Sequence, residues 1–147
     1  DNTHLQMHLL EEAAILLPKD IVFIVKPHPS CPVYPLDYPG LNMKVTMEPL
    51  STLLAKCDVV YSSSLTAAAI DAYSAGLPII SVLDPVKLNM SPLRGSNGVA
   101  FVSTPEELVS CLISAASSLP CGEQPESYFT LDSDLPRWRS LLLESSS

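Results

Sequence analysis

Two groups of polar side chains follow apolar runs in the first half of the chain. The sequence KPHP, at residues 26–29, follows the apolar run at residues 21–25, and three serines, at residues 62–64, follow the apolar run at residues 59–61. Ligands of open α/β sheets bind just beyond the carboxyl ends of the strands. We therefore expect the histidine and the serines to face one pocket, which binds the phosphate of a nucleotide.

The serine group, Ser62, Ser63 and Ser64, precedes an alanine-rich segment that we expect to form a helix over residues 65–75. The first N–H groups of a helix have no partner within it, and the helix dipole adds positive charge there. A single serine at a helix start is usually only an N-cap. Since one cap needs one hydroxyl, three serines favour a phosphate site.

His28 lies between Pro27 and Pro29, which stiffen the backbone and fix the position of the imidazole. A histidine after a strand can hydrogen-bond a phosphate oxygen and, when protonated, can neutralise charge on a departing nucleotide. The alternative is an ordinary loop histidine that bonds to backbone.

Asp71 and Arg94 are further candidate ligand contacts. Asp71 lies inside the predicted helix, where its carboxylate could accept a hydrogen bond from a ribose hydroxyl; a solvated helix face is the alternative. Arg94 lies in a loop, and its guanidinium group matches a carboxylate or a second phosphate. Its alternative is a surface charge.

Charge and composition exclude several classes. The net charge of −8, from 16 acidic and 8 basic side chains, argues against a nucleic-acid partner. The four cysteines include no CxxC pair, which is typical of reduced thiols in a cytosolic protein. His4 and His8 are four residues apart without a third ligand at a suitable spacing, so no metal site is expected. We expect no signal peptide and no membrane-spanning segment.

Apolar runs and helical segments alternate along the chain. We expect strands at residues 21–25, 43–47, 59–61, 79–83 and 99–102, and helices at residues 3–17, 50–56 and 65–75 and from Thr104, which forms a capping box with Glu107. This alternation predicts an α/β fold, a Rossmann-like three-layer sandwich with a parallel sheet of about five or six strands.

The length of 147 residues and the 47% of apolar residues suit one domain over residues 1–147. We expect residues 119–147 to form an irregular extension that ends in an amphipathic helix at residues 135–143. The chain begins inside a predicted helix, so we expect a fragment of a longer protein.

Residues 71–80, DAYSAGLPII, resemble the acidic-Ala-x-x-x-Gly-x-Pro-Val signature in the C-terminal, donor-binding domain of GT-B glycosyltransferases. The KPHP and serine segments are similar to the His-Pro and serine motifs of bacterial sialyltransferases, polysialyltransferases and Kdo transferases. The longer pattern, from Val60 through LNMSPLRG at residues 88–95 to LPRW at residues 135–138, resembles bacterial surface-carbohydrate biosynthesis proteins.

The resemblance implies that Asp71 binds the donor ribose and that His28 and the three serines hold the phosphate of a CMP-sugar. Asp71 stands where glutamate is more usual, which shortens its reach. The resemblance also implies a second, N-terminal domain that provides the acceptor site and the catalytic base. This fragment alone should then be inactive.

We therefore expect the donor-binding domain of a glycosyltransferase for bacterial surface polysaccharides, with a CMP-activated acidic sugar as donor. His28 would stabilise the leaving nucleotide and Arg94 would bind the carboxylate of the sugar, without a metal or another cofactor. The partners are the nucleotide-sugar and, through the missing domain, a glycan acceptor. The location is the cytoplasm or the inner face of the membrane, with peripheral membrane association of the parent protein as an option. The alternatives are a CDP-glycerol-type glycerophosphotransferase domain, a nucleotide-sugar epimerase-like domain and a non-catalytic binding or assembly module.

Overall fold

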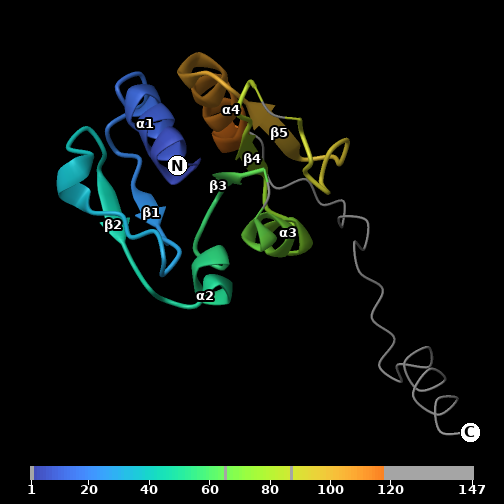
Figure 1. Cartoon of the computed structure of the whole chain (residues 1–147), viewed down its shortest axis with the longest axis horizontal. Helices are drawn as coiled ribbons and strands as arrows, with labels where there is room; N and C mark the ends of the chain where they lie inside the picture. Colours follow the sequence, from blue (N-terminus) through green and yellow to red (C-terminus); the bar gives the residue numbers. More distant parts are fainter. Residues whose placement is uncertain (1, 65, 87, 118–147) are drawn as a thin grey trace, which may run out of the picture.

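The structure is a computed structural model that describes residues 2–64, 66–86 and 88–117. Strands and helices alternate along this part of the chain, as the sequence predicts (Figure 1). The strands are β1 (Phe23–Val25), β2 (Met43–Val45), β3 (Val60–Ser63), β4 (Ile79–Val82) and β5 (Val99–Val102). The helices are α1 (Asn2–Ala14), α2 (Leu50–Leu54), α3 (Ala67–Ser74) and α4 (Pro105–Ser117), with a short 3-10 helix, η1 (Pro35–Asp37), between β1 and β2. The predicted helix at residues 135–143 lies outside the described residues.

The described strands form two parallel sheets. β1 pairs with β2, and β4 lies between β3 and β5 in a three-stranded sheet. No ladder joins β1 to β3 within the described residues. The α/β class with parallel strands is thus confirmed, whereas the predicted single sheet of five or six strands is not seen.

Several helix boundaries differ from the prediction, and α2 ends at Leu54 rather than at residue 56. α1 ends at Ala14 rather than at residue 17, because Leu16 and Leu17 donate their N–H groups to the carbonyls of Ala13 and Ala14, three residues back. α3 begins at Ala67, since the preceding residue is in an extended conformation, with φ −103° and ψ 140°. α1 and α3 are thus both shorter than the segments for which the apolar pattern predicts a helix.

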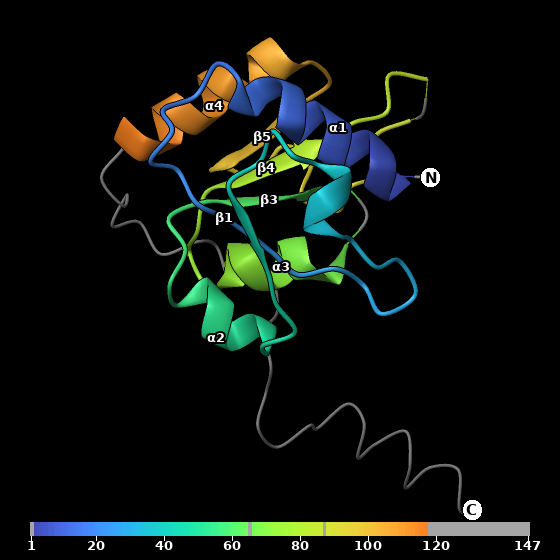
Figure 2. The same cartoon turned by 90° about the vertical axis from the view of Figure 1, so that its left-hand side faces the viewer.

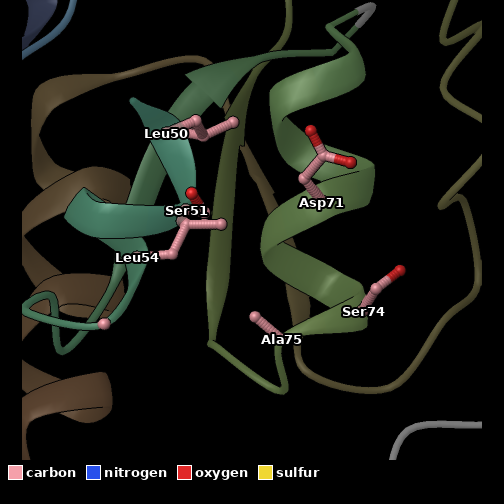
Figure 3. A pocket seen from close by; sticks show the side chains of 7 residues that line it. Leu50, Ser51, Leu54, Asp71, Ser74 and Ala75 are labelled. Atoms are coloured by element: carbon pink, nitrogen blue, oxygen red, sulfur yellow. The ribbon is translucent and has the colours of Figure 1, made fainter. Parts of the chain in front are cut away.

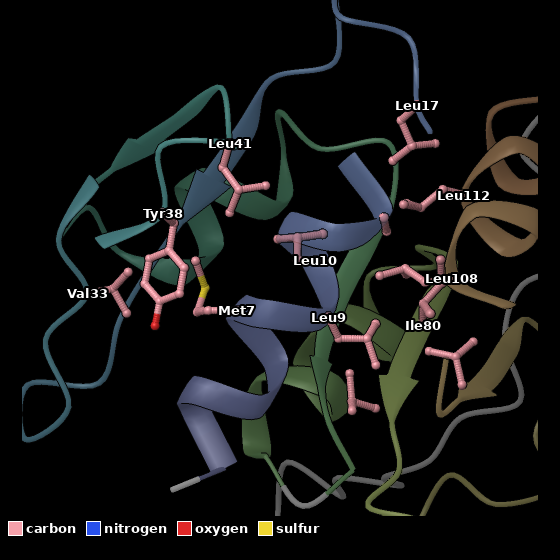
Figure 4. Close-up of a cluster of buried hydrophobic side chains, with 13 residues drawn as sticks. Met7, Leu9, Leu10, Leu17, Val33, Tyr38, Leu41, Ile80, Leu108 and Leu112 are labelled. Atoms are coloured by element: carbon pink, nitrogen blue, oxygen red, sulfur yellow. The ribbon is translucent and has the colours of Figure 1, made fainter. Parts of the chain in front are cut away.

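α1 and α4 cover one face of the three-stranded sheet, and their apolar side chains form the main core (Figures 1 and 4). Buried members of this core are Ile80, Val82 and Val102 from the strands and Leu9, Leu10, Leu108 and Leu112 from the helices. Phe23 and Val25 of β1 pack against the same cluster, so the two sheets share one core.

α3 covers the opposite face of the three-stranded sheet. Its inward residues Ala69, Ala72 and Tyr73 pack against Ile79 of β4 and against Leu93, which comes from the loop after β4. All four residues of β4 are buried, as expected for a central strand with helices on both faces.

Three of the segments that carry candidate residues lie on one side of the molecule. In Figure 2 the loop after β1, the turn after β3 and the loop after β4 all lie on the right-hand side, together with the beginning of α1. This side corresponds to the carboxyl ends of the strands, where α/β sheets bind their ligands.

Candidate functional site

A groove of ≈ 660 Å³ lies between α2 and α3 (Figure 3). Its lining is contributed by α2 and the residue after it, Leu50, Ser51, Leu54 and Ala55, and by α3 and the residue after it, Asp71, Ser74 and Ala75. The volume lies within the range of small-molecule sites, roughly 300–1,000 Å³.

Asp71 is the charged residue of this lining. It is exposed, and its carboxylate makes no hydrogen bond or ion pair within the described part of the chain. In Figure 3 it stands on the α3 wall, while Leu50 extends toward α3 from the opposite wall. Asp71 comes four positions after Ala67, which places it about 6 Å along the axis from the start of α3.

Ser62 and Ser63 end β3, and Ser64 follows in the turn toward α3. The Ser62 hydroxyl donates to the carbonyl of Ser63 at 3.2 Å, and the Thr66 hydroxyl donates to the same carbonyl at 3.4 Å. None of the three serines caps α3. Thr66 is the N-cap residue, and its side chain makes no capping hydrogen bond because it bonds backward to this carbonyl. The N-cap side chain of α3 therefore accepts no hydrogen bond from the first-turn N–H groups of the helix.

Ser81 of β4 is the register partner of Ser62 on β3. It is fully buried, and its hydroxyl has no hydrogen-bond partner among the described residues. Small polar side chains thus continue from the end of β3 into the neighbouring strand, beneath α3.

His28 is exposed and lies in a tight turn that the hydrogen bond from the Cys31 N–H to the His28 carbonyl closes at 2.9 Å. The Ser30 N–H donates to Nδ1 at 3.2 Å, and the Ser30 hydroxyl oxygen lies 2.6 Å from the same nitrogen. Because Nδ1 is an acceptor, the neutral ring carries its proton on Nε2. The Nε2–H makes no hydrogen bond within the described part of the chain and is available as a donor.

The contacts of His28 are local, as the alternative of an ordinary loop histidine expects. No hydrogen bond in the described part of the chain joins His28 to the three serines. The structure shows that both segments follow parallel strands, each in its own sheet.

Lys26 provides a connection that sequence reasoning missed. Its Nζ donates to the backbone carbonyl of Glu48 at 2.8 Å, and the Glu48 carboxylate pairs with Lys56 at 3.2 Å. Glu48 lies between β2 and α2, so this bond ties the end of β1 to the segment that leads into the groove wall. The sequence shows the lysine but gives no sign that a distant backbone carbonyl is its acceptor.

Arg94 lies apart from the groove. It is exposed, and its N–H closes a turn by donating to the Ser91 carbonyl at 3.2 Å, while the neighbouring Leu93 is buried against α3. Its guanidinium group contacts no acidic side chain in the described residues.

His4 and His8 both face Tyr38. The His4 Nδ1 lies 3.0 Å from the Tyr38 hydroxyl, and the His8 ring meets the Tyr38 ring edge-on with centroids 5.5 Å apart. Burial, together with Asp37 and Glu11, raises the pKa of Tyr38. In the part of the chain that the structure describes, no group of three histidine, cysteine or acidic residues could hold a metal ion.

Comparisons of the chain with family models, with curated proteins and with solved structures found no match. None of the described helices combines the length and apolar character that a membrane span requires.

Proposed function

We propose that this chain is the donor-binding domain of a glycosyltransferase that builds bacterial surface polysaccharides, and that its donor is a CMP-activated acidic sugar. The observation that carries the proposal is the groove between α2 and α3, with Asp71 on its wall one turn from the start of α3. This arrangement offers adjacent places for a nucleoside and for its phosphate.

In this proposal the nucleoside lies in the groove, against Leu50 and Leu54. A ribose hydroxyl donates to the Asp71 carboxylate, which has no other partner among the described residues. The separation of about 6 Å along α3 between Asp71 and Ala67 suits the step from a ribose to its 5′-phosphate. The phosphate then accepts hydrogen bonds from the first-turn N–H groups of α3 and from Ser62, Ser63 and Ser64.

His28 acts on the departing nucleotide in this proposal. Its Nε2–H is a donor, because Ser30 holds Nδ1 as an acceptor. A donor aimed at a phosphate oxygen stabilises the charge that develops when the sugar leaves. The bond from Lys26 to Glu48 supports this role, since it fixes the end of β1 beside the entrance to α2.

The proposal includes a finer description of the fold. With β1 beside β3, the strand order becomes β2-β1-β3-β4-β5, a single parallel sheet in a Rossmann-like sandwich. The order reverses between β1 and β3, and ligands bind at such a switch point. His28 and the serines follow these two strands.

The remaining parts of the proposal concern the whole protein. A second domain would hold the glycan acceptor and the catalytic base, and Arg94 would reach the carboxylate of the donor sugar. The cytoplasm, or the inner face of the membrane with peripheral association, is the proposed location.

Thermal unfolding in the presence of CMP, CDP, UDP, cytidine or inorganic phosphate tests the proposal. A ligand at 100 times its Kd stabilises the folded state by about 2.7 kcal/mol, which raises the Tm of a domain of this size by roughly 10 °C. We expect CMP to give the largest shift. A preference for UDP would instead indicate an epimerase-like domain, and a preference for CDP a glycerophosphotransferase. No response to any nucleotide would overturn the proposal in favour of a non-catalytic module.

Two variants separate the roles of the residues. Asp71→Asn removes a charge-assisted hydrogen bond worth about 1.5–3 kcal/mol, so the Kd for both CMP and cytidine should rise about 10- to 150-fold. His28→Ala should weaken the binding of CMP but leave the binding of cytidine unchanged, because His28 acts on the phosphate alone. Asp20→Asn, which makes the same change at an exposed site outside the groove, is the matched control and should alter neither affinity.

A further inference from the structure

The groove between α2 and α3 is an apolar surface that no described segment covers. Leu50 and Leu54 on one wall and Ala75 on the other provide its apolar lining, and Asp71 provides a negative charge. Figure 3 shows these side chains along facing walls, with Leu50 and Asp71 nearer the start of α3 than Leu54 and Ala75.

The segment at residues 135–143, which lies outside the described residues, has the complementary chemistry. Its sequence, LPRWRSLLL, places Trp138, Leu141 and Leu142 at the spacing i, i+3, i+4 that shares one face of a helix. Arg137 and Arg139 are the neighbours of Trp138 and flank that face. The segment therefore pairs an apolar stripe with two positive charges.

The connecting chain is long enough to reach the groove. Between Ser117, the last described residue, and residue 135 there are 18 steps of the chain, which span about 60 Å when extended. The radius of gyration of a domain of this length is only about 14 Å. Every face of the domain is within reach, so charge decides between the uncovered surfaces.

A second uncovered apolar surface lies on the β1–β2 sheet, where Val22 and Ile24 are 60% and 40% exposed. Ile24 is paired in register with Lys44, and the two side chains therefore share this face of the sheet. Lys44 is exposed and would repel the arginines of the segment. Asp71 in the groove would attract them.

We propose that residues 135–143 dock into the groove between α2 and α3 of their own chain, with Trp138, Leu141 and Leu142 against Leu50 and Leu54 and an arginine facing Asp71. If the groove also holds the nucleoside, which is the part that rests on the proposed function, the segment and the nucleotide exclude each other.

Trp138 is the one tryptophan of the chain, so its fluorescence reports on the segment alone. In the full chain we expect Trp138 to emit at shorter wavelength than in urea and to be shielded from acrylamide. Asp71→Lys replaces an attraction between exposed charges by a repulsion of similar size, so the docked-to-undocked ratio should fall roughly 2- to 30-fold. Asp20→Lys, the matched control, should leave the emission unchanged.

Two further variants keep the test independent of folding defects. Combining Asp71→Lys with Arg137→Glu and Arg139→Glu should restore shielding, because the charges are exchanged. Leu141→Asp, which alters only the segment, should release Trp138 while the thermal transition of the domain is kept. Failure of either result would overturn the docking.

The remaining outcomes separate this inference from the proposed function. Release of Trp138 by CMP supports both. If the parent chain binds no nucleotide but Asp71→Lys still releases Trp138, the docking is supported and the proposed function is refuted. A CMP thermal shift that Asp71→Asn abolishes, but that leaves Trp138 emission unchanged, places the segment outside the groove and overturns the inference. Shielding that depends on protein concentration assigns the groove to a second copy and also overturns it.

Discussion

Leu93 offers a direct test of how the loop after β4 is held in place. It lies in an irregular loop, yet its side chain is fully buried among Ala69, Ala72, Tyr73 and Ile79. Two of these neighbours are alanines on a helix, which are too small to fill the space left by a shorter side chain. Leu93→Ala should therefore leave a cavity and lower the free energy of unfolding by about 2–5 kcal/mol, which corresponds to a fall in Tm of roughly 8–20 °C.

Urea denaturation followed by circular dichroism measures this loss. The matched control is Leu88→Ala, the same substitution in the same loop at a side chain that is 86% exposed; it should stay within about 0.5 kcal/mol of the parent chain. If the two variants unfold at the same urea concentration, then Leu93 does not anchor the loop and the packing of α3 described above is wrong.

The remaining predictions concern pH and helix capping. Burial raises the pKa of Tyr61 well above its usual value, so the folded state keeps the phenol proton at a pH where the unfolded chain releases it; the stability present below about pH 10 should fall as the pH rises beyond that value. Tyr61→Phe should weaken this fall in urea denaturation, and the part that persists reports Tyr38, Cys57 and Cys111, whose pKa values burial also raises. Thr104→Ala removes the hydroxyl that accepts the Glu107 N–H at 3.3 Å and should lower the free energy of unfolding by about 1 kcal/mol. Ser110→Ala on the exposed side of α4 is its control, and an equal loss in both variants would contradict the capping role.

The elements and the capping of the last described helix were predictable from the sequence because local patterns determine them. The apolar run at residues 79–82 became the buried central strand β4. Thr104 and Glu107 form the expected capping box: the Glu107 carboxylate accepts the N–H groups of Ser103 and Thr104 at 2.7 and 3.3 Å. Gly76 follows the end of α3 with φ +77°, a conformation that glycine adopts without strain.

The order of the strands within the sheets was not predictable from the sequence. The pattern of apolar side chains shows which face of a strand is buried, but not which strands lie side by side. Val25 and Tyr61 both show an inward face toward the shared core, yet their strands belong to different sheets. The carbonyl acceptor of Lys26 and the extended conformation of Thr66 escaped prediction for a related reason. Both depend on backbone positions that only the folded chain establishes.

Of the candidate site, the sequence identified Asp71, which the structure places on the wall of a groove. It did not identify the other wall, because Leu50 and Leu54 look like ordinary packing residues of a short helix. Only the chemistry of its guanidinium group suggests Arg94 as a ligand contact, and the structure places it outside this groove.

Two of the three buried, inward residues of α3 are alanines, and the third is Tyr73. Ala69 and Ala72 present single methyl groups to β4, so the helix axis can approach the sheet closely. Larger residues at these two positions would raise α3 and, with it, the rim that carries Asp71. The depth of the hollow beside the helix is thus set by two alanines that would never touch its contents, and variation there would tune the fit of a ligand from underneath.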